Sequence, residues 1–275
     1  MRSVLALVAL VAGSGCSDPP KHAPLIEPCR GNQCPVLGGL GSGSPGTGNG
    51  GAGGAGNGST GGIGGNTGKL TGTVVDLVDN TFRTSVNNTQ SAIVEAQGSS
   101  VSVVSAEWNG VDPFVLTGVQ TALDVAWLSV RPKTGNASLR TLTPVNLNLT
   151  ANVTLPLIQT DVIDAIFQSL TVPTTRTTGA GHLVVSFVGR SAGTGAAGVR
   201  VASSSTGVVA YRSGGFWSTD ATQTDGSGLV LVGNISAAAY PGTGVTLTLS
   251  GVINRAVTFA VASEAVTLAE LQLNL

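Results

Sequence analysis

The sequence predicts an all-β protein in which two antiparallel β-sandwich domains, joined by one helix, follow a disordered glycine-rich tether. Two features of the 275 residues predict this organisation: long runs of alternating apolar and polar residues between glycine-rich turns, and a run near the N-terminus in which glycine predominates. Such alternation between glycine-rich turns is typical of antiparallel strands that bury one face. The expected segments are a signal peptide at 1–15, a cysteine-containing stretch at 16–36, a linker at 37–68, a first sandwich at 69–155, a connecting helix and loop at 156–180, and a second sandwich at 181–275.

The first 15 residues have the layout of a secretory signal peptide. Arg2 is their only charge, residues 4–12 are apolar, and small residues follow at 13–15. The apolar block is shorter than the roughly 20 residues that cross a bilayer, so it is not expected to span one. We therefore expect this segment to direct export and to be removed.

The small residues that end at Cys16 resemble the lipobox of bacterial lipoproteins, in which the chain is cut before the cysteine and the cysteine is acylated. Ser14 and Gly15 match the two positions before the cut, and Gly13 stands where that family prefers an aliphatic residue. Ser17, rather than an aspartate, follows the cysteine. The resemblance implies a lipoprotein with palmitate-type chains on Cys16, held by this lipid in the outer membrane and facing the periplasm or the cell surface.

The three cysteines support this interpretation. With Cys16 used for lipidation, Cys29 and Cys34 remain, and no cysteine occurs after them. In an exported protein such a pair favours a disulfide that closes a small loop. Two free thiols or a weak metal pair remain the alternatives, and a zinc site would need two further ligands, of which His22 is the one nearby histidine.

The linker is compositionally distinct from the rest of the chain. Residues 38–68 contain 17 glycines in 31 positions. A segment with so little apolar surface behaves as a flexible coil, with a reach of roughly 30 Å. The GAGGAG run at 51–56 matches a dinucleotide-loop pattern but lacks the strand and helix that such a loop requires, so no cofactor is predicted. The 13 basic and 14 acidic residues leave no excess positive charge for nucleic acid.

Alternation places several strands in the folded part. Residues 146–155, 245–249 and 257–261 alternate as strands with one buried face, and residues 182–188 are apolar on both faces, as in a central strand. Near the C-terminus the apolar residues change phase, with Val266 and Leu268 in one phase and Leu271 and Leu273 in the other. This change predicts a bulge or break at residues 269–270.

One segment has helical periodicity instead. Pro156 is expected to open this helix and Pro173 to end it. The segment either packs on a sheet as a connecting helix or offers its apolar stripe to a partner. The residues of the stripe are Ile158, Val162, Ile163, Ile166, Phe167 and Leu170.

The two halves of the folded part look like copies of one seven-strand module. Residues 112–119 and 227–235 are each a short apolar run with a glycine near its end. An apolar strand precedes each run, at 71–78 and at 181–188, and an alternating strand follows, at 124–130 and at 245–250.

The second copy resembles the carboxypeptidase regulatory-like, or transthyretin-like, β-sandwich over residues 181–251. Asp225 and Gly228 stand in that family's Asp-x-x-Gly turn, Leu229 and Leu231 in the strand after it, and Gly233 at its exit, while residues 195–202 match an earlier strand. A generic immunoglobulin-like sandwich remains open for the first copy. The resemblance implies a non-catalytic accessory module with no active-site residues.

The sequence offers few catalytic groups. GRSAG at 189–193 matches a hydrolase nucleophile motif around Ser191, but no histidine follows His182, and the next predicted element is a strand. The same objection applies to the Gly-rich match at 193–198. We expect both runs to form a glycine-rich hairpin and His182 to be structural or exposed. No catalytic residue, metal site or cofactor is predicted, and the chain is not expected to be an enzyme.

Four aromatic residues are the remaining functional candidates: Trp108, Tyr211, Phe216 and Trp217. They either contact a ligand from glycine-rich loops or cover the sandwich core. The sequence thus predicts a lipid-anchored cell-envelope protein whose modules act as a structural or protein-interaction component, with an unidentified envelope protein or glycan as partner. The alternatives are a surface carbohydrate-binding or adhesive module and, as the least favoured, a hydrolase.

Overall fold

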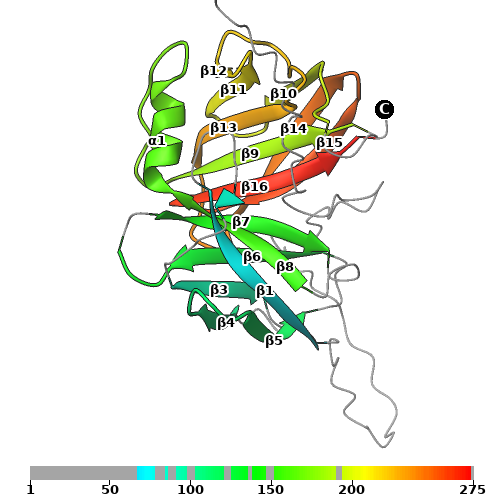
Figure 1. The fold of residues 1–275 in the computed structure, drawn as a ribbon. Coiled ribbons are helices and arrows are strands. Elements are labelled where there is room, and N and C mark those ends of the chain that lie inside the picture. Colours follow the sequence, from blue (N-terminus) through cyan, green and yellow to red (C-terminus); the bar gives the residue numbers. More distant parts are fainter. Residues whose placement is uncertain are drawn as a thin grey trace, which may run out of the picture.

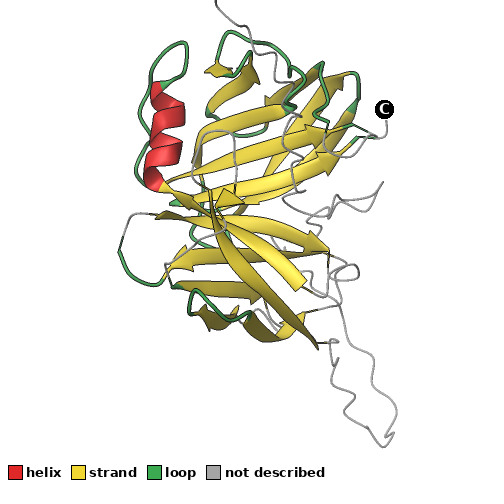
Figure 2. Ribbon diagram, viewed as in Figure 1, coloured by secondary structure: helices red, strands yellow, loops and turns green. Residues whose placement is uncertain are grey.

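A computed structural model describes residues 67–77, 84–85, 91–97, 103–120, 125–135, 138–146, 152–189 and 194–273. These residues form a mostly β structure with one helix (Figures 1 and 2). The elements are β1 (Thr67–Leu77), β2 (Thr84–Ser85), β3 (Ala92–Gln97), β4 (Val103–Trp108), β5 (Phe114–Gln120), β6 (Val125–Pro132), β7 (Ser138–Asn146), β8 (Asn152–Gln159), α1 (Thr160–Gln168), β9 (Ala180–Val188), β10 (Val199–Ser203), β11 (Val208–Ser213), β12 (Phe216–Ser218), β13 (Leu229–Ser236), β14 (Thr243–Gly251), β15 (Arg255–Val261) and β16 (Ala265–Gln272).

The alternating runs are strands with one buried face, as predicted. In β14 the side chains of Val245, Leu247 and Leu249 are buried, while the threonines between them are partly or fully exposed. β9 is buried along almost its whole length, which confirms a central strand covered on both faces. The predicted strand at 146–155 is instead divided, because residue 146 ends β7 and β8 begins at residue 152; residues 147–151 lie outside the described part.

The helix is shorter than predicted and begins later. Pro156 does not open it but lies within β8, paired with Val75 of β1, and α1 starts at Thr160. A proline is tolerated there because the other edge of β8 is paired with β7 only further along, at Ile158 and Gln159, among the described residues. The expected end of the first sandwich at residue 155 therefore falls inside a strand.

The predicted bulge at residues 269–270 is wrong. β16 pairs with β9 in one unbroken parallel register from Val266–His182 to Gln272–Val188. Its apolar residues change phase because both faces of the strand are covered. Leu268 packs in the helix-side core, whereas Ala269 and Leu271 pack in the core on the opposite face.

The main sheet runs through both halves of the folded part. Its strands follow the order β12-β11-β13-β9-β16-β7-β6-β3-β4, and the junction between the halves is the parallel pair β16–β7. Strands β5, β1 and β8 form a second layer on the first half, and β10, β14 and β15 a separate sheet on the second half (Figure 1).

These two additional layers lie on opposite faces of the main sheet. On β7, Leu139 packs with α1, and Val145, six residues later and thus on the same face, packs with β1 and β8. The β14 and β15 side chains instead pack against Leu183 and Leu271 on the other face of β9 and β16. Helix α1 and the β5-β1-β8 layer therefore share one face of the sheet.

The two halves have matching strand pairings. β1 pairs antiparallel with β5 and parallel with β8, and β9 pairs antiparallel with β13 and parallel with β16. β6 and β7 form an antiparallel pair, as do β14 and β15. The segments that correspond are those that the sequence aligned as copies. The parallel pairs correct the expectation of purely antiparallel sandwiches.

Helix α1 covers the apolar outer face of the second half. Val162, Ile163, Ile166 and Phe167 of its stripe are buried, in a core that includes Leu231 of β13. This burial favours the connecting helix over the partner-binding one. The same core also includes Leu77, Leu139 and Ile158 from the first half, so α1 packs against both halves.

Candidate functional site

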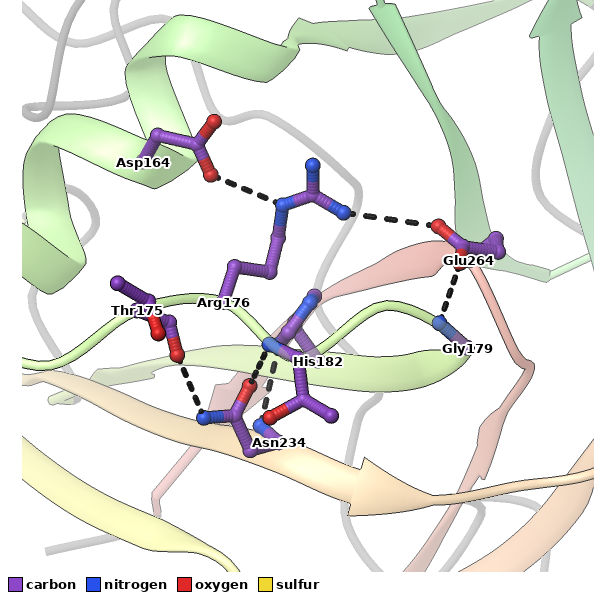
Figure 3. Close-up of polar contacts among 8 residues, drawn as sticks. Asp164, Thr175, Arg176, Gly179, His182, Asn234 and Glu264 are labelled. Carbon is purple, nitrogen blue, oxygen red and sulfur yellow. Dashed lines mark hydrogen bonds and ion pairs between the residues drawn. The ribbon is translucent and has the colours of Figure 1, made fainter.

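A polar cluster in the described residues joins three elements and two connecting segments around His182 (Figure 3). We call residues 169–179, which lead from α1 to β9, the strap, and we call the following residues the His182 cluster: Asp164 of α1, Arg176 of the strap, His182 of β9, Asn234 of β13 and Glu264 of the turn before β16.

Asn234 holds the strap against β13. Its side-chain amide accepts a hydrogen bond from the Thr177 N–H (2.8 Å) and donates one to the Thr175 carbonyl (3.0 Å), much as a neighbouring strand would. The pairing of β13 with β9 is irregular at this point, between residues 232 and 235. Asn234 has a φ of 57°, in the left-handed region that asparagine tolerates better than most residues. Local strain thus accompanies the contact with the strap.

Arg176 ties the strap to the helix and to the β15–β16 turn. Its Nε donates to Asp164 Oδ1 at 2.9 Å, and its Nη1 lies 3.5 Å from Glu264 Oε2. Glu264 also accepts a hydrogen bond from the Gly179 N–H and has a φ of 55°. Asn234 and Glu264 are the non-glycine residues with positive φ among those described, and both belong to the His182 cluster.

His182 is fully buried beneath the strap, with 0% of its surface exposed. The edge of its ring meets Phe167 of α1, with 5.2 Å between ring centroids and 68° between ring planes. Nδ1 accepts a hydrogen bond from the Asn234 N–H (3.2 Å), which places the ring hydrogen on Nε2. Nε2 is buried and has no hydrogen-bond partner in the described residues.

Burial, together with the nearby charge of Arg176, lowers the pKa of His182 to about 4, although Asp164 opposes both. The imidazole is therefore neutral at pH 7. Of the two outcomes that the sequence predicted, structural or exposed, the second is wrong, because the ring is buried and accepts a hydrogen bond. Ser191, the candidate nucleophile, lies outside the described residues, so nothing is seen of a Ser–His pair.

The Asp-x-x-Gly turn before β13 is also a closed polar unit. Asp225 Oδ1 accepts from the Ser227 N–H (2.8 Å) and hydroxyl (2.6 Å), and Oδ2 accepts from the Gly214 N–H (3.0 Å). Burial alone would raise the pKa of Asp225, but these hydrogen bonds and the charge of Arg212 outweigh it and lower the pKa. The turn fastens the β11–β12 hairpin to the start of β13.

The four aromatic candidates do not form one surface. Trp108, Tyr211 and Trp217 are buried, and the Tyr211 hydroxyl accepts a hydrogen bond from the Val201 N–H of β10 (2.9 Å). Phe216 alone of the four is exposed, at 74%, beside the Gly214–Gly215 turn. A ligand-contact role therefore stays a prediction for Phe216, whereas the buried rings contribute to the cores.

A second polar cluster lies at the junction of the two halves. Glu95 of β3 binds Arg131 (3.3 Å) and Arg140, and the Arg140 guanidinium lies 5.0 Å from the ring centroid of Tyr240, which belongs to the second half. Burial, together with the charge of Glu95, raises the pKa of Tyr240 to about 12, although Arg140 opposes both. Arg140 therefore contacts both halves through one side chain.

Glu270 of β16 provides a first testable prediction. Burial raises its pKa to about 7, well above its ordinary 4.5. Between pH 4.5 and 7 the folded protein retains a proton that the unfolded chain has lost, so this group lowers stability as pH rises. Glu270→Gln is expected to raise the midpoint of thermal unfolding at pH 8 and to have little effect at pH 4. An equal shift of the unfolding midpoint at both pH values would contradict this explanation. Glu107→Gln, at an exposed site, serves as the control.

Several predicted features fall outside the described residues. They include the three cysteines, Cys16, Cys29 and Cys34, and the linker up to residue 66. Strand β1 begins at Thr67, inside the expected linker. Within the described ranges, no group of three or more His, Cys, Asp or Glu residues could hold a metal ion. The described residues include no helix that is both long and apolar enough to cross a bilayer.

Comparison with known proteins identifies no family. No family model matches the chain, and no curated protein matches it. Similar solved structures include a Streptococcal ancillary pilin (10% identity, TM-score 0.24, 75% of this chain and 68% of that chain), the minor pilin of Streptococcus agalactiae (11%, 0.24, 74% and 94%) and the shaft pilin SpaA of Lactobacillus rhamnosus GG (12%, 0.21, 74% and 98%). Similarity at this level assigns no function to the chain.

Proposed function

We propose that this chain is a lipid-anchored, non-catalytic structural module of the cell envelope, made of two repeated sandwiches that resist stretching. One observation carries the proposal. In each half the first and last long strands lie side by side in parallel, β1 with β8 and β9 with β16. The registers run from Thr71–Asn152 to Leu77–Ile158 and from Val266–His182 to Gln272–Val188.

Because the first and last strands of a half are adjacent and parallel, a pull on the chain on either side of that half acts along the two strands. When the chain is pulled before β1 and after β8, the two strands slide past one another, and all of their mutual hydrogen bonds are loaded together. An antiparallel pair pulled from its two free ends would instead open one hydrogen bond at a time. The arrangement therefore suits a module that keeps its length under load.

The contacts between the halves support the same role. β7 and β16 pair in parallel at residues 140–142 and 265–267, and Arg140 contacts both Glu95 and Tyr240. The core under α1 adds apolar contacts from both halves. Together these contacts favour two sandwiches that move as one body rather than as beads on a flexible chain.

A single glycine allows this mechanical prediction to be tested. A Cβ on Gly72 of β1 would lie 2.1 Å from the Val153 carbonyl oxygen of β8, closer than any real contact. In single-molecule stretching of the full chain held at its two ends, Gly72→Ala is expected to lower the force of the first unfolding event. Gly226→Ala, where an added Cβ meets nothing within 4 Å, is the matched control. If Gly72→Ala and the wild type show the same force for the first unfolding event, the result would count against the proposal.

The lipid anchor is a separate part of the proposal, supported by the sequence around Cys16. Two or more acyl chains give stable anchoring, since each buried methylene contributes about 0.8 kcal/mol. We expect Cys16→Ser to abolish palmitate labelling and to move the protein from the membrane to the soluble fraction. Label and membrane association that survive in Cys16→Ser would refute the anchor while leaving the mechanical proposal standing.

An adhesive role is the second candidate, and the exposure of Phe216 favours it. This ring projects from a hairpin whose turn is Gly214–Gly215, while its neighbour Trp217 is anchored in the core. Exposed aromatic rings on rigid hairpins are suited to flat sugar or protein surfaces. Saturable binding of the full chain on a glycan array that is lost in Phe216→Ala would establish this role, and no binding would exclude it for the glycans tested.

A further inference from the structure

The strap makes few backbone–backbone hydrogen bonds to the rest of the protein and is held mainly through side chains, including a Thr171–Ser218 hydroxyl bond (2.9 Å) and the Glu264 carboxylate at Gly179. Most of its residues are exposed, and its backbone is held at one end by the Thr174 N–H bond to Phe167 O (3.2 Å) and at the other by the Ala180 N–H bond to Thr177 O (3.1 Å). Between these points the Asn234 amide and the Arg176 ion pairs hold it to β13, α1 and the turn before β16. Loss of the Asn234 contacts would therefore detach the middle of the strap from β13 and leave it held there through Arg176 alone.

The backbone of Asn234 depends in turn on the protonation state of His182. The Asn234 N–H points at Nδ1, which can accept only while the ring is neutral. A protonated ring carries N–H groups on both nitrogens, so two donors would face each other across 3.2 Å. Because His182 is fully buried, bulk solvent does not reach the ring to take over either donor.

We propose that His182 is an acid-operated release for the strap: proton uptake at Nδ1 breaks the hydrogen bond from Asn234, and the Asn234 side chain then releases Thr175 and Thr177. The stored strain favours release, since Asn234 leaves its left-handed conformation when the contact is lost. This regulatory device does not depend on the mechanical or adhesive proposals.

The charges around His182 influence how the strap responds when the ring takes up a proton. Arg176 repels a protonated ring from the strap side, and the carboxylates that face the site, Asp164 from α1 and Glu264 from the turn, are already engaged with Arg176. Of the groups further away, Asp161 of α1 is exposed and Glu270 of β16 lies four residues beyond Val266, the partner of His182 in the parallel pair. Arg176 thus opposes the imidazolium, and Asp164 offsets part of this effect.

Release of the strap would loosen the cover over an apolar face. The strap connects the end of α1 to the sheet, and α1 covers Val184, Leu231 and Leu268. Acid would therefore make this face accessible while the two sandwich cores, which contain no part of the strap, remain packed.

Nuclear magnetic resonance of the ¹⁵N-labelled full chain between pH 7.5 and 3.5 tests this proposal. We expect the amide signal of Thr177, whose N–H is bound by the Asn234 side chain, to move to a position typical of a free segment, with the same midpoint as the His182 imidazole, while the β14 amides stay in place. A strap that changes only together with β14 would mean global acid unfolding and would overturn the proposal.

Two variants test separately the protonation of His182 and the release of the strap by the Asn234 side chain. His182→Phe retains an aromatic ring against Phe167 but can neither titrate nor accept the Asn234 N–H, so the strap signals should lose their pH dependence and have free positions throughout. Asn234→Gly suits the positive φ but removes the side-chain amide, so the strap signals should have free positions already at pH 7.5. A strap transition that persists unchanged in His182→Phe would assign the effect to the carboxylates of Asp164 and Glu264 and would refute the role of His182.

Discussion

Gly228→Ala is expected to lower the free energy of unfolding by at least about 3 kcal/mol, because the substitution combines backbone strain with a collision. Gly228 has a φ of 69°, in the left-handed region, and an added Cβ would lie 2.1 Å from the Phe187 carbonyl oxygen. The Gly228 carbonyl also accepts a hydrogen bond from the Phe187 N–H (2.9 Å), so the two backbones cannot separate without losing it. Equilibrium denaturation in urea measures this loss.

Gly226→Ala, two residues earlier in the same turn, is the control for this measurement. An added Cβ there meets nothing within 4 Å, and the expected change is within about 0.5 kcal/mol. A loss of similar size in both variants would show that the turn tolerates neither side chain for a reason unrelated to the close approach of Phe187. A negligible loss in Gly228→Ala would contradict the tight packing of the Asp-x-x-Gly turn.

Acidification is expected to produce the second large effect, through His182. The pKa of this group is about 4 in the folded protein, against 6.5 for an ordinary histidine. Between these values the unfolded chain binds a proton that the folded protein does not, so stability is complete above pH 6.5 and falls as the pH drops towards 4. The difference in pKa corresponds to about 3 kcal/mol over this window.

Other groups titrate in the same range, so the useful quantity is the difference between wild type and His182→Phe. Glu270 acts in the opposite direction, because its protonation below pH 7 relieves a half-buried charge. The variant loses the acceptor for the Asn234 N–H and should be less stable at pH 7.5. Its deficit should shrink as the pH approaches 4, and a deficit that stays constant would refute the assignment to His182.

The strands and the helix were predictable because their signals are local. The alternation in residues 245–249 fixes which side chains of β14 are buried, and the apolar stripe from Val162 to Leu170 identifies the face of α1 that packs. The repeat was visible for the same reason, since each copy carries similar runs in the same order. The turn at Asp225 and Gly228 was recognisable because its residue types are required by its backbone conformation.

The pairing of the strands was not predictable from these signals. Alternation says that a strand has a buried face, but not whether its neighbour runs parallel or which sheet it joins. The phase change in β16 was misinterpreted as a bulge, because a strand covered on both faces needs no break to bury both sets of side chains. The position of Pro156 in β8 was missed because a proline fits the start of a helix and a partly unpaired strand equally well.

The His182 cluster could not be predicted from the sequence, for a different reason. Its members come from α1, the strap, β9, β13 and the last turn, and only folding brings them together (Figure 3). Asn234 and Glu264 have no distinctive sequence context, although an asparagine directly after Gly233 is a weak signal for an irregular strand. The importance of Asn234 comes from three hydrogen bonds to segments more than 50 residues away.

The central claim, that parallel first and last strands make the module resist stretching, is tested most directly by pulling one strand pair in two directions. With the native cysteines replaced (Cys16→Ser, Cys29→Ser, Cys34→Ser), one handle is attached at Thr178→Cys, just before β9. The second handle is attached either at Gln272→Cys, at the far end of β16, or at Ser263→Cys, just before its start.

The first geometry slides β9 along β16, and the second peels the two strands apart from one end. We expect a several-fold higher unfolding force in the sliding geometry, because the hydrogen bonds of the pair are then loaded together rather than in turn. Equal forces in the two geometries would contradict the proposed mechanical function.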